Sequence, residues 1–227
     1  MLILALEQSA PSCSAAILRN GVTAAETCWQ PAGLHNQHMF EVLPELFKAA
    51  GCSPADVDLF ALGTGPGAFS ALRIAAAALA GLAAPGGQPV IGVPSTEALA
   101  LDLWLAHHVS PLLIVGDARR GRYWRALYAG IDGAVPCALP PALCAPEDLA
   151  ALLPAGGIVA SPDWSRMTPA FPGLLPPAAR LLAENSVPRA AMIARLAAAR
   201  FELGPPWAPA VPLYLTPSTN VAPKFLR

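Results

Sequence analysis

The segment 63–74, with the sequence GTGPGAFSALRI, has residue types that could bind phosphate. Glycines let a backbone approach a phosphate closely, and free N–H groups at the start of a helix bind anions. A P-loop adds a lysine and a Ser/Thr for the phosphate charge and magnesium, whereas Arg73 is the only charged residue here. We therefore interpret Pro66 and Gly67 as the centre of a type II turn, with positive φ at Gly67. Ser70 is the expected N-cap of the following helix.

Two histidines and a carboxylate have the spacing of half a metal site. His35, His38 and Glu41 would lie on one face near the start of a helix. Peptidases with the HExxH pattern space their histidines by four residues, and here the spacing is three. Because no third strong ligand is visible, we interpret the pair as surface or interface histidines. The GxSxG pattern of a nucleophile elbow is absent from the sequence.

The segment DARRGRYWR, residues 117–125, gathers arginines around two aromatic residues on a predicted hairpin. Guanidinium groups interleaved with aromatic rings could contact a phosphate, a nucleotide or RNA. The alternatives are a hairpin tip whose arginines pair with local acids or solvent, and a contact with an acidic patch of a partner. We keep Arg119, Arg120 and Arg122 as possible nucleotide, RNA or partner contacts.

The composition restricts the classes of protein that fit. The chain has 227 residues with 55% hydrophobic and 13% charged residues, and a net charge of -1, which excludes a globally basic nucleic-acid-binding protein. The five cysteines form no CxxC pair, so we expect reduced thiols in a cytosolic protein rather than disulfides or zinc. We also expect no signal peptide and no membrane-spanning helix. Low charge with many apolar residues favours apolar surface covered by another chain.

The first half of the chain reads as an α/β lobe. Asn20-Gly21 is a hairpin signal, and the apolar period then changes from strand-like to helical. The expected strands are 1–8, 13–18, 22–30, 58–63 and 90–93, and the expected helices run from about 34 to 50, from 70 to 84, and from Ser95, which would act as a cap. The resulting βββαβα order with mixed sheets is that of a ribonuclease-H-like lobe.

The second half repeats this plan more loosely, which predicts an internal duplication. Its expected strands are 111–117, 123–129, a third ending near Leu139, and 157–161, and its expected helices are 146–153, 177–185 and 189–201. We divide the chain into a first lobe at 1–106, a smaller degenerate lobe at 107–203, and a Pro-rich extended tail at 204–227. Within the tail, 213–215 is the only apolar segment.

The helix expected at 70–84 is apolar all round. Leu72, Ala75, Ala76, Leu79 and Leu82 form one stripe, and Ile74, Ala77, Ala78 and Gly81 form the opposite side. A helix of this kind is buried on all sides. One side would cover the sheet, and the other would face the second lobe or another protein.

Several segments together resemble the bacterial TsaB (YeaZ) family. They are LILALEQSAPSCSAAILRNG, QHMFEVLPELFKAAG, LGTGPGAFSALRIAAAALAGLA and VIGVPSTEALA in the first half, and DARRGRYW in the second. The resemblance implies two ribonuclease-H-like lobes of the actin/Hsp70/sugar-kinase superfamily. It also implies a non-catalytic subunit in the synthesis of threonylcarbamoyladenosine in tRNA, in the cytoplasm and away from membranes.

The resemblance further implies partners and an interface. TsaB pairs with itself or with TsaD, which carries the ATP and the metal, and the ATPase TsaE joins them, so this chain would need no cofactor and would meet tRNA indirectly. Its first two helices would form the interface, with contacts from His38, Val42, Leu46, Phe69, Leu72, Arg73, Ala76 and Leu79. Arg73, alone among apolar neighbours, should have an acidic or carbonyl partner in this chain or across the interface.

The sequence departs from the family at three places. Glu7-Gln8 stands where the family usually has Asp-Thr, Ser70-Ala71 where it has Thr-Gly, and Thr216 where it has Arg. Glu7 could still hold a cation through water, but no glycine opens the following hairpin, which argues against nucleotide hydrolysis. Two alternatives remain open: an ATP-dependent transferase or kinase of the same fold, and a metallopeptidase-like protein.

Overall fold

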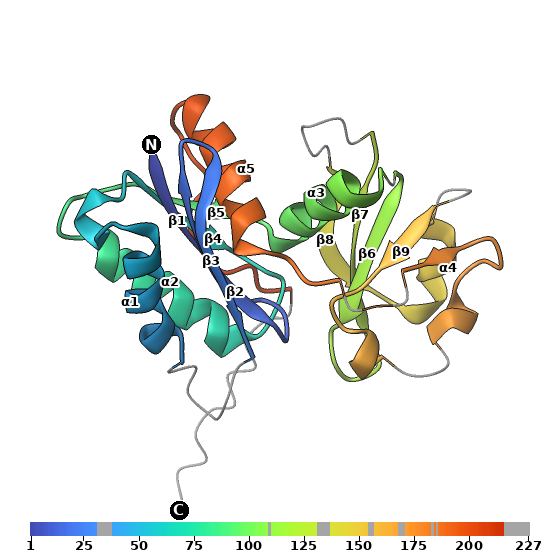
Figure 1. Ribbon diagram of the computed structural model, residues 1–227. Helices are drawn as coiled ribbons and strands as arrows, with labels where there is room; N and C mark the ends of the chain where they lie inside the picture. The colour runs from blue at the N-terminus through green and yellow to red at the C-terminus, as the bar shows by residue number, and fades with distance from the viewer. Residues whose placement is uncertain are drawn as a thin grey trace, which may run out of the picture.

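The computed structural model describes residues 1–30, 38–108, 110–130, 137–153, 157–167, 171–182, 184 and 186–215. These residues form two α/β lobes, each built on a five-stranded sheet (Figure 1). His35, Thr216 and the first part of the helix expected at 34–50, all taken up in the sequence analysis, lie outside the described residues.

The first sheet has the strand order β3-β2-β1-β4-β5. Its strands are β1 (Leu2–Glu7), β2 (Cys13–Arg19), β3 (Val22–Trp29), β4 (Leu59–Gly63) and β5 (Val90–Val93). The first three strands pair antiparallel, and β4 and β5 extend the sheet in parallel. The predicted hairpin is present, with positive φ at Asn20 and Gly21. This is the expected ribonuclease-H-like order.

The second sheet repeats the first strand for strand, in the order β8-β7-β6-β9-β10. Its strands are β6 (Leu112–Asp117), β7 (Tyr123–Tyr128), β8 (Cys137–Cys144), β9 (Ile158–Ala160) and β10 (Arg180–Leu181). β6, β7 and β8 pair antiparallel, and β9 and β10 follow in parallel. The two-lobe α/β prediction is thus confirmed.

Helices cover both faces of the first sheet (Figure 1). α1 (His38–Ala50) and α2 (Phe69–Ala83) pack on one face, and α5 (Ala190–Glu202) packs on the other. β1 contributes side chains to the cores on both faces of the sheet, because successive side chains of a strand point to opposite faces. Leu4 and Leu6 join α1 and α2, whereas Ile3 and Ala5 join α5. This explains why the strand is apolar at every position.

α3 (Ser95–His107) lies between the two sheets (Figure 1). Ala98 and Leu101 pack into the core of the first lobe, and Leu99 and Leu103 pack into the core that lies on β6 and β7. The helix α5 falls within the range 107–203 but packs on the first sheet, where the Ala190 N–H donates to Ser14 Oγ at 2.9 Å. The division at 106 and 203 stays a prediction, and residues from both ranges build the first lobe.

The second half differs from the prediction at three elements. The segment 177–185, expected as a helix, contains β10, because the Arg180 and Leu182 N–H groups pair with the backbone carbonyls of Gly157 and Val159. β8 continues past Leu139 to Cys144, and the expected helix 146–153 is a 3-10 turn at Pro146–Asp148 followed by the short α4 (Leu149–Leu152). Prolines at the boundaries hide these strand and turn segments from helical periodicity.

Two general expectations concern the whole molecule. Within the described ranges, no helix has the length and apolar character needed to cross a membrane. All five cysteines are free thiols.

Candidate functional site

The loop between β4 and α2 is tied to the body of the first lobe. The Gly65–Pro66 peptide is cis, and positive φ occurs at Gly65, at +95°, rather than at Gly67, so the predicted type II turn is wrong. Gly67 is needed for space, because a Cβ there would collide with the backbone of Ser9. The Gly65 N–H donates to Ser95 Oγ at 2.9 Å. The loop therefore packs against the end of β1.

Two predicted helix caps are wrong as well. α2 begins at Phe69 with Ala68 as its N-cap, so Ser70 lies within the first turn. α3 has Pro94 as its N-cap, and the Ser95 hydroxyl serves the Gly65 N–H instead. Neither serine side chain satisfies the N–H groups of its own helix. The first N–H groups of α2 consequently have no side-chain cap.

Glu7, at the end of β1, is an acidic residue with no access to solvent. Its side chain is fully buried, and Oε1 accepts a hydrogen bond from the Ser9 N–H at 2.6 Å. Burial raises the pKa of Glu7 above its ordinary value, and hydrogen bonds from Ser9 and Ser95 partly offset this shift. Gln8 is 1% exposed. A fully enclosed carboxyl of this kind is poorly suited to hold a hydrated cation.

The carboxyl fits only because β4 has a glycine opposite it. A Cβ at Gly63 would collide with Glu7 Oε2. Within the described part of the chain, Glu7 Oε2 and both polar side-chain atoms of Gln8 have no hydrogen-bond partner. No group of three or more His, Cys, Asp or Glu in these ranges could hold a metal ion.

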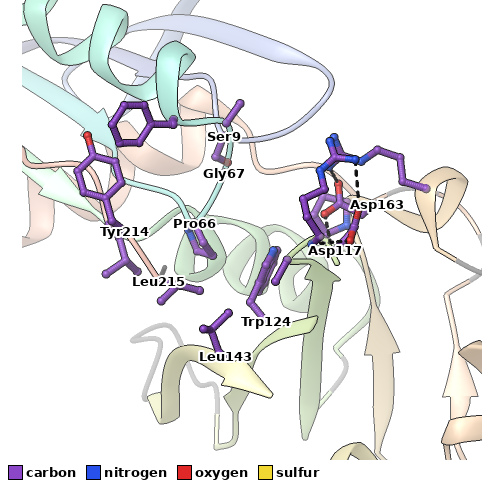
Figure 2. Close-up of a pocket in the computed structure, with 16 residues that line it drawn as sticks. Ser9, Pro66, Gly67, Asp117, Trp124, Leu143, Asp163, Tyr214 and Leu215 are labelled. Carbon is purple, nitrogen blue, oxygen red and sulfur yellow. Dashed lines mark hydrogen bonds and ion pairs between the residues drawn. The ribbon is translucent and has the colours of Figure 1, made fainter. Parts of the chain in front are cut away.

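A cavity of about 480 Å³ lies between the lobes (Figure 2). Its first-lobe wall is made by Ser9, the start of α2 and the tail segment Leu213–Leu215. The second-lobe wall contains Trp124 and two acids, Asp117 and Asp163. Each acid is paired with an arginine, Asp117 with Arg119 at 3.3 Å and Asp163 with Arg166. Burial raises the pKa of Asp163, and Arg166 opposes the shift. The charges in this wall are therefore paired.

The arginine segment does not form one patch. Arg119 borders the interlobe cavity, and Arg120 and Arg122 are exposed in the turn between β6 and β7. Arg125 contacts β8 instead, where its Nη1 donates to the Pro140 carbonyl at 2.5 Å. Arg119 and Arg120 have φ of 67° and 55°, a left-handed conformation that costs a non-glycine residue about 1–2 kcal/mol. Their role as contacts stays a prediction.

An apolar groove of about 650 Å³ runs between α1 and α2 on the surface of the first lobe. We call it the α1/α2 groove. Every residue that lines it is uncharged: Phe40, Leu43, Ile74, Ala77, Ala78, Gly81 and Leu82. Phe40 is 56% exposed. Large apolar side chains open to solvent in a continuous groove mark a surface that another molecule covers.

The predicted interface residues divide between the core and the surface. Leu46 and Leu79 belong to the core of the first lobe, and Leu72 is fully buried beside Gly65. These leucines face inward because the bulky side chains of an amphipathic helix pack on its sheet. As the structure stands, they offer no surface to a partner.

The remaining predicted residues lie closer to the surface. Val42 and Ala76 are half-buried against the core, and His38 is half-buried with Nδ1 2.8 Å from Glu41 Oε2. The surface of α2 is instead its small-residue side. Phe40 was absent from the predicted set, although its position next to the helical apolar stripe was a usable signal.

Arg73 has a partner that differs from the expected one. Its Nε donates to the hydroxyl of Tyr214 at 2.9 Å, and its guanidinium lies 3.8 Å from the centroid of the Phe69 ring. Arg73 forms no ion pair with an acid among the described residues. The acidic or carbonyl partner expected for Arg73, in this chain or across an interface, is not found among the described residues and stays a prediction.

Comparisons with known proteins agree on one family. The sequence model described as "TsaD: tRNA N6-adenosine threonylcarbamoyltransferase" matches residues 31–198. The tRNA threonylcarbamoyladenosine biosynthesis protein TsaB of Escherichia coli (strain K12) is 32% identical over 127 residues, covering 55% of this chain and 54% of that protein. The TsaB protein of Haemophilus influenzae is 30% identical over 118 residues, with 52% and 49% covered. The chain spans about half the length of the curated relatives it matches.

The similarity to a solved structure covers nearly the whole chain. YeaZ from Pseudomonas aeruginosa superposes with a TM-score of 0.81 at 28% identity, over 94% of this chain and 99% of that one. This superposition shows that the two chains share one fold. The chain belongs to the TsaD-related family and, within it, to the TsaB (YeaZ) proteins.

Proposed function

We propose that this protein is a subunit of the machinery that transfers threonylcarbamoyl to an adenosine of tRNA. In this proposal it has no catalytic site of its own and supports a TsaD-like catalytic subunit. The names of the relatives from Escherichia coli and Haemophilus influenzae support the pathway. The arguments for a non-catalytic subunit come from this chain's own residues.

The α1/α2 groove is the observation that carries the proposal. Its lining is apolar and has no charge to keep it in water. Ala77, Ala78 and Gly81 place small side chains on the outer side of α2, which lets a helix of a partner approach closely. We assign this groove to a TsaD-like subunit, and to a second copy of this chain when no such subunit is present.

The closed loop after β4 supports a non-catalytic role. Gly67 lies against Ser9, and the Gly65 N–H is already bonded, so the loop has little freedom to wrap a phosphate. Glu7 is enclosed where an exposed acid would be needed for a hydrated cation. In this proposal ATP and the metal belong to the partner, a TsaE-like ATPase joins the complex, and tRNA is contacted through it in the cytoplasm.

Co-purification with the TsaD-like protein of the same genome tests the proposal. We expect Ala77→Asp to abolish the complex and to remove threonylcarbamoyladenosine from tRNA in cells that depend on the variant. Ala49→Asp is the matched control, because Ala49 is an exposed alanine on the α1 side outside the groove. A complex that survives Ala77→Asp, or tRNA that stays modified after depletion of the protein, would contradict the proposal.

A further inference from the structure

Three residues at the N-terminal end of α2 form a small aromatic and cationic unit, which we call the Arg73 clamp: Phe69, Arg73 and Tyr214. Phe69 and Arg73 are one helical turn apart, and the guanidinium stacks over the Phe69 ring at 3.8 Å. The rings of Phe69 and Tyr214 pack with their centroids 4.7 Å apart. The Arg73 Nε donates to the Tyr214 hydroxyl at 2.9 Å. The guanidinium is thus held on two sides.

The tail positions Tyr214 through backbone contacts on the first lobe. The Leu213 N–H donates to the Thr64 carbonyl at 2.8 Å, directly before the clamp. Upstream, the Gly92 N–H donates to the Ala208 carbonyl at 2.9 Å. A Cβ at Gly92 would collide with the carbonyl of Pro209, so the tail lies tightly on β5. Tyr214, which lies 141 residues from Arg73, is therefore a fixed part of this surface.

The clamp leaves strong donors unused. Of the five N–H groups of a guanidinium, only the one on Nε has a partner among the described residues, and within these ranges Nη1 and Nη2 bind no protein group. The Tyr214 hydroxyl accepts from Nε and retains its own hydrogen for donation. Phe69 and Tyr214 are 42% and 40% exposed, and Arg73 is exposed, so an incoming group can reach them.

The clamp lies between two hollows: Phe69 and Tyr214 line the interlobe cavity, and Arg73 lies on the side of α2 that continues into the α1/α2 groove. Arg73, Ala77 and Gly81 recur at intervals of four residues, so they lie along one side of α2. Ala77 and Gly81 line the groove, whose lining is uncharged. Arg73 is therefore a charged group at the end of an apolar contact surface. A group that covers this surface must either pair with the guanidinium or bury it unpaired, which is costly.

We propose that the Arg73 clamp binds a carboxylate of the docked subunit, the side chain of an aspartate or glutamate. This inference rests on the proposed function and names the chemistry of its contact. A guanidinium binds a carboxylate through two parallel hydrogen bonds, and the stacked, hydrogen-bonded position of Arg73 limits the entropy lost on binding. An RNA phosphate is disfavoured, because nucleic-acid binding needs several cations and the groove beside Arg73 is apolar.

Affinity measurements with the TsaD-like subunit of the same genome test the clamp. By calorimetry we expect Arg73→Gln to weaken the complex about tenfold to a hundredfold, as for loss of a hydrogen-bonded charge. Tyr214→Phe, which keeps the ring but not the hydroxyl, should weaken it about threefold to tenfold. Arg73→Lys should fall between wild type and Arg73→Gln, since lysine keeps the charge without the planar fork.

Arg195→Gln is the matched control, because Arg195 is an exposed arginine on α5, on the other face of the first sheet. It should bind as the wild type does. Each variant should also melt at the wild-type temperature within about two degrees, since the residues are exposed. Arg73→Gln binding within twofold of wild type would overturn the clamp while leaving the proposed function intact. A wild-type chain that forms no complex would overturn both the clamp and the proposed function, and among these affinity measurements no other outcome bears on the proposed function.

Discussion

Thr96 of α3 and Tyr128 of β7 share a 2.6 Å hydrogen bond between their hydroxyls where the two lobes meet. Both residues are buried, and burial raises the pKa of Tyr128 above its ordinary value of 10.0. The bond therefore joins the helix between the sheets to the second sheet through two groups that have no access to bulk water.

Tyr128→Phe should lower the free energy of unfolding by about 1–3 kcal/mol, because it leaves the buried Thr96 hydroxyl without its partner. Adding Thr96→Val should recover much of the loss, since the double variant removes both polar groups. Urea unfolding of the wild type, the two single variants and the double variant measures the four free energies that are compared. A double variant as unstable as the sum of the two single variants would show that the hydroxyls do not interact.

Tyr128, one of the three tyrosines, should resist ionisation in the folded protein. The raised pKa means that the Tyr128 phenol stays protonated in the folded protein when the pH passes 10.0. Absorbance at the wavelength of tyrosinate should therefore rise at alkaline pH by less than expected for the full set, and the missing part should appear on unfolding. A complete rise in the folded protein would mean that water reaches this phenol.

Glu7 should make stability depend on pH in an unusual direction for a carboxylate. Its folded pKa is raised above 4.5, so the folded state holds the proton at pH values where the unfolded state has lost it. This contribution is present below about pH 4.5 and is lost as the pH rises through the folded pKa. Glu7→Gln removes the titration, so its stability relative to wild type should increase from pH 4 towards pH 8. Parallel pH profiles would contradict the assignment.

Two glycines of the β4–α2 region should respond in opposite ways to alanine. Gly67→Ala should destabilise the fold by about 1–3 kcal/mol, since the new Cβ would collide with Ser9. Gly81→Ala should stabilise it by up to about 1 kcal/mol, because nothing lies within 4 Å of its Cβ position in α2. Thermal unfolding of the pair checks both. A tolerated Gly67→Ala would mean that the loop can leave β1.

At Arg120, in the turn between β6 and β7, one substitution can change stability and function in opposite directions. Arg120→Gly should raise the free energy of unfolding by about 1 kcal/mol, because glycine adopts φ of 55° without strain. If Arg120 contacts tRNA or a partner, this more stable variant should still support less tRNA modification. Arg120→Lys keeps the charge and the strain and is the control. If tRNA modification with Arg120→Gly equals that with the wild type, Arg120 is not a contact residue.

Local signals in the sequence predicted most of the fold. Asn20-Gly21 marks a hairpin, and the alternating faces of β1 require apolar residues on both sides, so the first sheet could be predicted strand by strand. The repeated plan in the second half followed from the same signals. The segment 177–185 could not be predicted, because two residues of β10 pair with β9 and such a short pairing has no period of its own.

Less of the candidate site than of the fold could be predicted from the sequence. The sequence showed that α2 is apolar on every side, but not which side faces the sheet, because alanine and glycine fit both environments. Leu72 and Leu79, which the sequence analysis places at the interface, are buried. The partner of Arg73 could not be predicted either, because Tyr214 reaches it through the tail, 141 residues away, and no local pattern links the two.

The Pro-rich tail also bears on how the protein avoids self-association through its sheets. β5 is the outer strand of the first sheet, and such a strand presents unpaired N–H and C=O groups that can recruit a strand of another chain. The tail covers this edge with a single antiparallel bridge between Ile91 and Pro209. Proline has no N–H to donate, so the covering segment does not extend the ladder. The tail therefore ends the sheet and guards the chain against aggregation through this edge.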